Sequence, residues 1–302
     1  MTSNLSQEAQ VWYGQASVLQ GLGRYGAALE KFDRVLALAP AHAPTWAYRG
    51  YALYELRRYG EALESFRRSL QYDPKYGLAW HGCGVVQAKL RQFDAAADSL
   101  TRAVSLDPED TKAWYNRGKA LMRLQQYGDA IASFDAMIAR QPESHRAWYN
   151  RALALAHQRR YTDALSSLDT AVTLKPDCDY AWTYRGLMLN KLRRFEEAHA
   201  SFGRSLRFKT PNPQALYGQA VTYGLQGKAE QAAQSLQAAM AGDSRLHQRL
   251  LQGDPNFSHL MDTPAFQALL KTANAMEIAT GDPLDWQQYS SLDDGPDAPA
   301  DL

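Results

Sequence analysis

Residues Ala113–Gly118 read AWYNRG and residues Ala147–Ala152 read AWYNRA, two nearly identical stretches that begin 34 residues apart. The same spacing runs along most of the chain. Tryptophan stands at 12, 46, 80, 114, 148 and 182, and proline stands at 40, 74, 108, 142 and 176, each at intervals of 34. A fixed period of this length indicates a repeated supersecondary unit, so the chain has to be analysed repeat by repeat.

The repeat frame is counted from three residues before each tryptophan. It gives seven repeats, at 9–42, 43–76, 77–110, 111–144, 145–178, 179–212 and 213–246, the last degenerate because Leu216 replaces tryptophan. Positions 17, 20, 24 and 28 of each repeat step by three and four residues, and positions 4, 8 and 11 form a second stripe, as in two amphipathic helices. Position 8 is always glycine or alanine and position 20 always alanine, which predicts a close approach of the two helices there.

This pattern resembles the tetratricopeptide repeat family over residues 9–246. The signature residues of repeat 4 are Trp114, Gly118, Tyr127, Ala130, Phe134 and Pro142. The resemblance implies an all-α fold without strands, a right-handed superhelix (solenoid) of about seven helix-turn-helix repeats. It also implies an inner groove lined mainly by the first helix of each repeat. Trp114 and Trp148 are expected to be core residues that join the first helix to the second.

Both ends of the chain depart from the repeat. Residues 1–8 lead into the first repeat, and residues 247–280 predict helices outside the 34-residue register that cap the last repeat. The side chains expected to form that cover are Phe257, Leu260, Phe266, Leu269 and Leu270. The last 22 residues, 281–302, contain six aspartates and no basic residue, a composition that predicts a disordered acidic tail.

The composition argues against several classes of function. Thirty-three basic and 32 acidic residues give a formal charge of +1, which argues against bulk attraction to nucleic acid. No stretch of about 18 apolar residues predicts a membrane span, and the amino-terminal residues show no signal-peptide pattern. Two widely separated cysteines suggest a reducing compartment, so a cytoplasmic location is expected. Neither a metal-ligand spacing nor a catalytic motif is present, so we expect a non-enzymatic protein without a cofactor.

The groove supplies the candidate binding residues. In the family, positions 2, 5, 6, 9, 12 and 13 of the first helix face the concave surface. These positions give Tyr51, Tyr54, Lys112, Tyr115, Asn116, Lys119, Arg146, Tyr149, Asn150 and Asn190 as peptide-binding candidates. Asparagine amides donate to and accept from a peptide backbone, tyrosines offer flat apolar area, and basic groups attract carboxylates. The expected function is a scaffold that binds an extended acidic or aromatic-containing segment of a partner protein.

Basic residues outside the groove leave two alternatives open. Without the tail, the chain keeps 33 basic and 26 acidic residues, a formal charge of +7, which admits an RNA-binding helical array. Arginine pairs also recur at the turns. They can be interpreted either as local pairs with acidic residues of the next helix or as a binding site for an anionic partner. Arginine at position 7 makes the edge of the first helix basic at Arg49, Arg117, Arg151 and Arg185. The tail, with Trp286 and Tyr289 among its aspartates, is a further candidate occupant of the chain's own groove.

Overall fold

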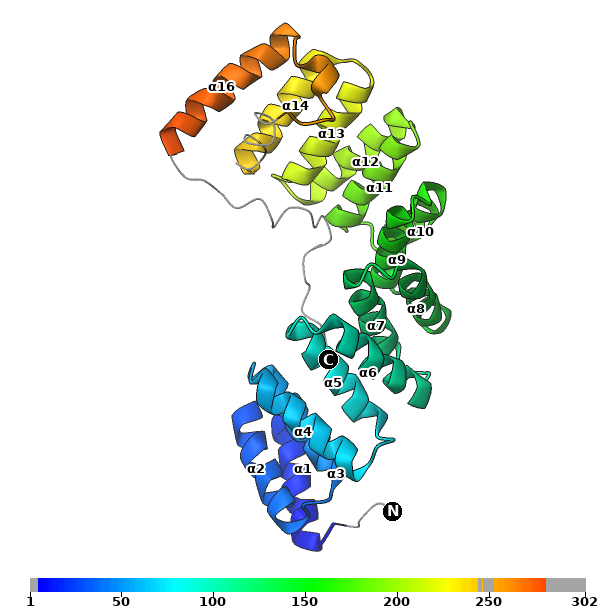
Figure 1. The fold of residues 1–302 in the computed structure, drawn as a ribbon, viewed down its shortest axis with the longest axis vertical. Helices are drawn as coiled ribbons and strands as arrows, with labels where there is room; N and C mark the ends of the chain where they lie inside the picture. Colours follow the sequence, from blue (N-terminus) through cyan, green and yellow to red (C-terminus); the bar gives the residue numbers. More distant parts are fainter. Residues whose placement is uncertain (1–4, 244–245, 247–252, 281–302) are drawn as a thin grey trace. The chain divides into compact units, whose positions relative to one another are not determined.

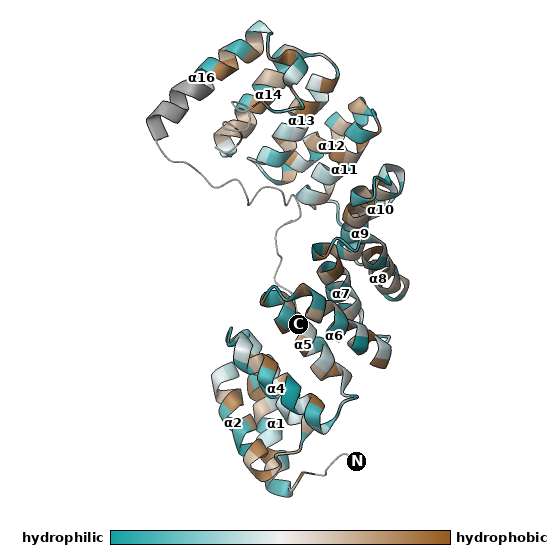
Figure 2. Ribbon diagram, viewed as in Figure 1, coloured by the Kyte–Doolittle hydropathy of each residue, from teal (hydrophilic) through white to brown (hydrophobic). Residues whose placement is uncertain are grey.

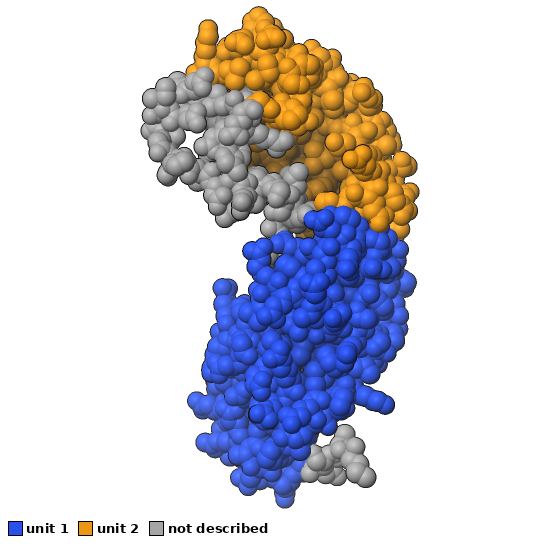
Figure 3. Space-filling view, viewed as in Figure 1, with its two compact units in different colours: residues 1–143 blue, residues 144–302 orange. Residues whose placement is uncertain are grey.

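The computed structural model describes residues 5–243, 246 and 253–280, and every regular element in these ranges is a helix (Figure 1). It forms two compact units, residues 1–143 and 144–302 (Figure 3). The first unit contains α1 (Gln7–Gly21), α2 (Tyr25–Leu38), α3 (Ala43–Glu55), α4 (Tyr59–Tyr72), α5 (Gly77–Lys89), α6 (Phe93–Leu106), α7 (Thr111–Arg123) and α8 (Tyr127–Arg140). The second contains α9 (His145–His157), α10 (Tyr161–Leu174), α11 (Asp179–Lys191), α12 (Phe195–Phe208), α13 (Pro213–Leu225), α14 (Ala229–Gly242), the 3₁₀ helix η1 (Ser258–Leu260) and α16 (Pro264–Thr280).

Each unit is a stack of helix pairs. In the first unit, α1 packs on α2, α3 on α4, α5 on α6 and α7 on α8, and the second helix of each pair also contacts the first helix of the next. In the second unit, α9 to α14 pair in the same way, and α16 packs on α14. The predicted all-α fold of repeated helix pairs is therefore confirmed. The predicted acidic tail and residues 247–252 of the predicted cap lie outside the described residues.

Side-chain caps and left-handed turns fix where the helices begin and end. Asp110 caps α7, because its Oδ1 accepts the backbone N–H of Ala113 at 2.9 Å. Between the two helices of a repeat, position 15 has positive φ in all seven repeats. The residues are Gly23, Arg57, Arg91, Gln125, Arg159, Arg193 and Gly227. At Arg57 the following N–H, that of Arg58, donates to the carbonyl of Leu53 at 2.9 Å, a closure typical of a helix end.

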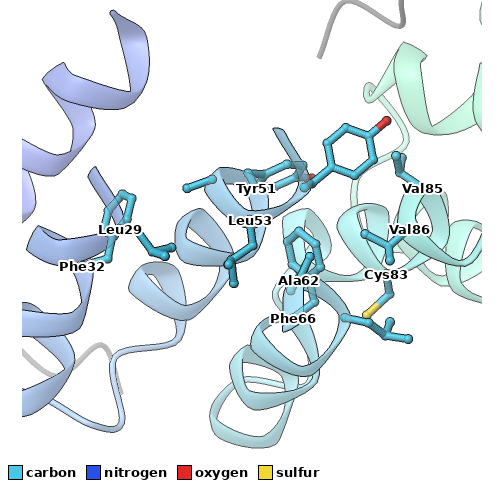
Figure 4. Packing of buried hydrophobic residues seen from close by; sticks show 14 of the residues in the cluster. Leu29, Phe32, Tyr51, Leu53, Ala62, Phe66, Cys83, Val85 and Val86 are labelled. Atoms are coloured by element: carbon cyan, nitrogen blue, oxygen red, sulfur yellow. The ribbon is translucent and has the colours of Figure 1, made fainter. Parts of the chain in front are cut away.

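The core of each repeat is a ring or leucine at position 24 that lies over the small residue at position 8. A Cβ atom added to Gly118 would lie 2.6 Å from Cε1 of the fully buried Phe134, so only glycine permits this approach. Figure 4 shows the equivalent packing around Phe66 in repeat 2, with Leu53 and Val86 beside it. Hydrophobic and hydrophilic segments alternate along the helices of both units (Figure 2), as the periodic pattern predicts.

The repeated tryptophans are not core residues, contrary to expectation. Trp114 and Trp148 are only half-buried. The indole N–H of Trp114 donates to the carbonyl of Pro108 at 2.9 Å, and the guanidinium of Arg140 lies 5.7 Å from its ring centre. Trp114 therefore fastens the loop that precedes α7, while Phe134 fills the space between the two helices.

The residues expected to form the cap contact the last repeat. Phe257, Leu260, Phe266 and Leu269 are buried in one cluster that includes Leu236 of α14. Ring contacts link this cluster to α13, where Tyr217 meets Phe257 edge-on at 6.0 Å. The division of the chain into lead-in, repeats, cap and tail remains a prediction from the sequence.

Candidate peptide-binding surface

In the first unit, four of the candidate residues share one face of α7. Tyr115, Asn116 and Lys119 follow Lys112 by three, four and seven residues, which places all four along the same side of the helix. Both lysines are exposed, and the ammonium of Lys119 lies 6.0 Å from the ring centre of Tyr115. This face joins two positive charges, an aromatic ring and an amide, the groups that bind a carboxylate-bearing peptide.

A buried histidine holds the asparagine of this face in place. Nε2 of His81, on α5, lies 3.1 Å from Nδ2 of Asn116. Nδ1 of His81 lies 2.8 Å from Oδ2 of Asp110. With a proton on Nδ1, His81 donates to Asp110 and accepts from Asn116, which leaves the oxygen of Asn116 and its second N–H outside this contact. His81 stands at position 5 of repeat 3, one of the groove positions of the family, whereas Asp110 lies outside those positions, one residue before α7.

Asp110 is the anionic end of this network. Burial alone would raise the pKa of its carboxyl, but the His81 hydrogen bond and the N–H groups of Ala113 and Lys112 outweigh burial and lower that pKa. Asp110 therefore stays ionised and both caps α7 and orients His81. His81 is 4% exposed, which makes it a support for Asn116 rather than a group in contact with solvent.

Two candidate tyrosines of the first unit lie inside the stack. Tyr51 and Tyr54 are each 9% exposed. The Tyr51 hydroxyl donates to the carbonyl of Leu78 on the next first helix at 3.0 Å, and its ring meets Phe66 edge-on at 4.9 Å. Burial raises the pKa of Tyr51 well above its usual range. Tyr51 thus joins repeats 2 and 3, and neither ring is presented for a ligand.

Three further tyrosines, Tyr13, Tyr48 and Tyr76, lie on or next to the first helices of repeats 1 to 3. Tyr13 of α1 meets Tyr48 of α3 edge-on, with ring centres 6.1 Å apart. Burial, then the proximity of Tyr48 and Asp73, raises the pKa of Tyr76 to about 12. Tyr76 therefore remains a neutral phenol whose hydroxyl can donate a hydrogen bond. Tyr76 lies outside the groove positions of the family and was missed because it precedes α5.

The second unit places its candidates on α9 and α11. Arg146 and Asn150 are half-buried, and the amide of Asn150 donates to the backbone carbonyl of Arg146 at 2.8 Å. Tyr149 is 5% exposed and is enclosed edge-on by Tyr180 at 4.7 Å and Tyr184 at 5.4 Å. Tyr149 is thus a packing residue of an aromatic cluster and is not presented for a ligand.

Asn190 joins repeats 6 and 7 by hydrogen bonds. It is 6% exposed. Its amide donates to the carbonyl of Gly218 at 3.3 Å, and its oxygen accepts the hydroxyl of Thr222 at 3.0 Å. Because its donor and acceptor are both engaged inside the stack, the structure does not bring Asn190 to a ligand surface.

The arginines at position 7 also differ from the sequence interpretation. Nε of Arg49 donates to Oδ1 of Asp33 in the preceding repeat at 2.7 Å, and Nη1 donates to Oγ of Ser65 in its own repeat at 2.7 Å. Equivalent bonds join Arg117 to Thr101 and Ser133, Arg151 to Ser167, and Arg185 to Asp169 and Ser201. These arginines clamp helices together and do not form a basic edge.

The arginines at the turns pair locally, as the first of the two sequence interpretations held. The ion pairs join Arg58 to Glu61, Arg160 to Asp163 and Arg194 to Glu197, each at 2.7 Å. The neighbouring turn arginines Arg57, Arg159 and Arg193 occupy the left-handed position of the turn. Within the described ranges, no group of three or more metal-ligating side chains occurs, and no helix is long and apolar enough to cross a membrane.

The family of the chain follows from a comparison with known proteins. The tetratricopeptide repeat model matches residues 13–76, 84–139, 117–177, 158–210 and 185–245. The chain therefore belongs to the tetratricopeptide repeat family, whose members are in general scaffolds for protein–protein interaction and not catalysts. No curated protein matches the chain.

Solved structures of other repeat proteins resemble the chain. YrrB, a TPR protein with an unusual peptide-binding site, is 28% identical over 56% of this chain and 88% of its own, with a TM-score of 0.51. The C-terminal part of a TPR protein from Cytophaga hutchinsonii is 17% identical over 77% of this chain and 95% of its own, with a TM-score of 0.63. A tetratricopeptide repeat protein from Parabacteroides merdae is 17% identical over 89% of this chain and 100% of its own, with a TM-score of 0.58. The last two likenesses concern the fold alone.

Proposed function

We propose that the chain is a non-enzymatic scaffold that binds an extended acidic segment of a partner protein on its first-helix surfaces. The observation that carries the proposal is the face of α7, where exposed Lys112 and Lys119 flank Tyr115 and the supported amide of Asn116. A similar use is on record for YrrB, which has a peptide-binding site. On the second unit, Arg146 and Asn150 supply a smaller set of the same kind.

The proposal predicts that the affinity for a peptide depends on the charge of that peptide. We expect a fluorescein-labelled peptide of aspartates and glutamates around one tyrosine to bind at least about tenfold more tightly than its lysine counterpart. Lys112→Glu combined with Lys119→Glu should remove that preference, because both attractive charges are reversed. The matched control, Lys75→Glu with Lys175→Glu, makes the same change in net charge at exposed loop positions and should leave affinity unchanged.

The asparagines test the peptide-backbone contact separately from charge. Asn116→Ala should weaken the acidic peptide several-fold, and Asn150→Ala should weaken it less, because the Asn150 amide already donates to its own helix. Fluorescence anisotropy at two salt concentrations separates the two contributions, since the charge effect is screened and the amide contact is not. Equal affinity for acidic and basic peptides, or wild-type affinity in the lysine double variant, would refute the proposed function.

Self-interaction through residues 281–302 is part of the same proposal. The tail carries six aspartates with Trp286 and Tyr289 between them, the chemistry that the α7 face would recognise. Deleting 281–302 should raise the affinity for the acidic peptide, because the competing segment is removed. Unchanged affinity after deletion would exclude tail occupancy.

RNA binding is the weaker alternative. The turn arginines Arg58, Arg160 and Arg194 are paired with neighbouring carboxylates, and those at position 7 bind inside the stack. The surface on which an RNA backbone would lie is thus largely neutralised. A cytoplasmic location is proposed on the sequence evidence of the two isolated cysteines, Cys83 and Cys178, which are both free thiols.

A further inference from the structure

The junction between successive repeats has one recurring form. The second helix of a repeat packs on the first helix of the next, as α4 packs on α5 and α12 on α13. At α5 this contact buries Ala79 and Val86 completely, at positions 3 and 10 of the repeat. Positions 3 and 10 therefore form the face on which each first helix receives the helix that precedes it.

Helix α1 carries the same face with nothing described in front of it. Its positions 3, 10 and 14 are Val11, Val18 and Leu22, which are 54%, 63% and 66% exposed. Val11 and Val18 lie seven residues apart on one side of α1, and Leu22, the C-cap residue of α1, continues that line four residues further on. Isolated apolar residues on a surface are ordinary, but exposed valines at both positions that are buried at α5 mark an interaction site.

A glycine at position 6 shows what this face is shaped to receive. At Gly82 and Gly218, an added Cβ would lie 2.3 and 2.4 Å from the ring of the phenylalanine that the preceding second helix supplies, Phe66 or Phe202. The glycine thus opens a notch that the ring fills. Gly14 of α1 stands at the same position, and nothing lies within 4 Å of a Cβ built there.

The charge pattern supports the same conclusion. Residues 9–23, AQVWYGQASVLQGLG, contain no charged residue, whereas the terminal repeat of a stack ordinarily presents a polar outer face to water. Apart from Glu8 in its first turn, the exposed side of α1 therefore carries no charge, and Val11 and Val18 make part of it apolar, where a capping face would be charged. A neutral, apolar face with a notch is suited to an apolar helix surface rather than to an extended acidic peptide.

We propose that Val11, Gly14, Val18 and Leu22 form a second binding surface, which receives an amphipathic helix of a partner protein with a phenylalanine that enters the notch at Gly14. The established interface between repeats is the template, since the same positions receive such a helix at α5 and α13. A second copy of the chain does not supply the phenylalanine that enters the notch. Its phenylalanines at the equivalent position are fully buried: Phe32, Phe66, Phe134 and Phe202.

A synthetic peptide of residues 57–74, which contains α4 and Phe66, is the probe for the full chain. We expect it to shift the backbone amide signals of Gly14 and Val18 in nitrogen–proton correlation spectra. A Phe66→Ala peptide should bind at least about fivefold more weakly. Because an isolated helix of this length is marginal in water, residues 43–76 are also fused directly before residue 9. That fusion should raise the unfolding temperature by about 3 °C or more relative to the same fusion carrying Gly14→Leu, which fills the notch without altering the core of the fused repeat.

Gly14→Leu fills the notch and should weaken the peptide at least about fivefold, while Gly26→Leu, at an equally open helix position on α2, should not. Lys112→Glu with Lys119→Glu should also leave this peptide unaffected, which separates this surface from the one proposed on α7. Binding that Gly14→Leu does not weaken, or no signal shift and no thermal gain, overturns the proposal. A dimer of the chain that Val18→Glu dissociates overturns it as well, because the occupant is then a second copy.

Discussion

The junction of α2 with α3 and the junction of α4 with α5 have the same backbone arrangement but opposite chemistry. At the first, Arg49 binds Asp33 of the preceding repeat at 2.7 Å. At the second, the residue equivalent to Arg49 is Cys83, and the residue equivalent to Asp33 is Arg67. Burial is the main cause that raises the pKa of the Cys83 thiol, to about 12, so this position is neutral where Arg49 is charged.

Position 6 differs between the same two junctions. Tyr48 stacks on Phe32 of the preceding repeat with ring centres 6.4 Å apart, whereas Gly82 lets Phe66 into the space that a side chain would fill. In each case the residue of the first helix matches its neighbour on the preceding second helix. A residue in this repeat is therefore interchangeable only together with its partner across the junction.

Cys83→Arg is expected to have the largest effect. It places a guanidinium at a buried position near Arg67 without the acidic partner that Arg49 has, and we expect it to lower the free energy of unfolding by about 2 to 4 kcal/mol. Urea unfolding monitored by circular dichroism measures the loss. Adding Arg67→Asp should restore at least half of it, because it recreates the pair of the α2–α3 junction. A double variant no more stable than Cys83→Arg would show that the two positions are not coupled.

Gly82→Ala should be the next largest. The added methyl group meets the ring of Phe66, and the overpacking should lower the free energy of unfolding by about 1 to 3 kcal/mol. Gly14→Ala, at the same repeat position, has open space and should instead stabilise α1 by about 0.5 to 1 kcal/mol through lower backbone entropy in the unfolded chain. Thermal unfolding of the two variants in parallel gives the sign directly, and a common sign would contradict the notch at Gly82.

Arg49→Ala tests the clamp itself. It removes charged hydrogen bonds to Asp33 and Ser65 from a guanidinium whose side chain is 20% exposed, and a loss of about 1 to 2 kcal/mol is expected. The control is Arg67→Ala, at an exposed position on α4, which should change the free energy of unfolding by less than about 0.5 kcal/mol. Equal losses in the two variants would mean that the α2–α3 junction does not depend on its arginine.

The smallest effect concerns a feature that both repeats share. Arg57 and Arg91 have φ of 59° and 61° in the turns after α3 and α5. Replacing either with glycine relieves the left-handed strain, and each variant should gain up to about 1 kcal/mol. The two gains should agree within the error of denaturant titration, since the turns have the same geometry. If the two stability gains differed widely, the turns as well as the junctions would contribute to the difference between repeats 2 and 3.

The period of the sequence was enough to predict the helices. Helix α3 begins at Ala43 and α7 at Thr111, the first residues of repeats 2 and 4 in the sequence frame. This succeeded because helix amphipathicity and small residues at close contacts are local requirements that recur in every copy. The role of tryptophan was misjudged because a large aromatic residue is compatible both with a core and with a half-buried loop contact.

The candidate site was only partly accessible to the same reasoning. Lys112 and Lys119 are exposed on one face, as expected of groove residues. Tyr51, Tyr149 and Asn190 stand at groove positions too, yet each is buried by side chains of adjacent repeats. A groove position is defined by helix geometry, but exposure at that position depends on the size of neighbours 30 or so residues away in sequence.

The sequence by itself determined the helix pairs, their order and the small residues that let them pack, because each of these depends on spacing within about one repeat. Only the tertiary structure decided which polar groups face outward. The amide of Asn116 is held by His81, which Asp110 of the preceding repeat orients. The amide and oxygen of Asn190 are both hydrogen-bonded inside the stack, to Gly218 and Thr222 of the next repeat. The physical reason is that a hydrogen-bonding group exposed on one helix can be satisfied by a neighbouring repeat, and whether it is depends on side chains brought together only by stacking.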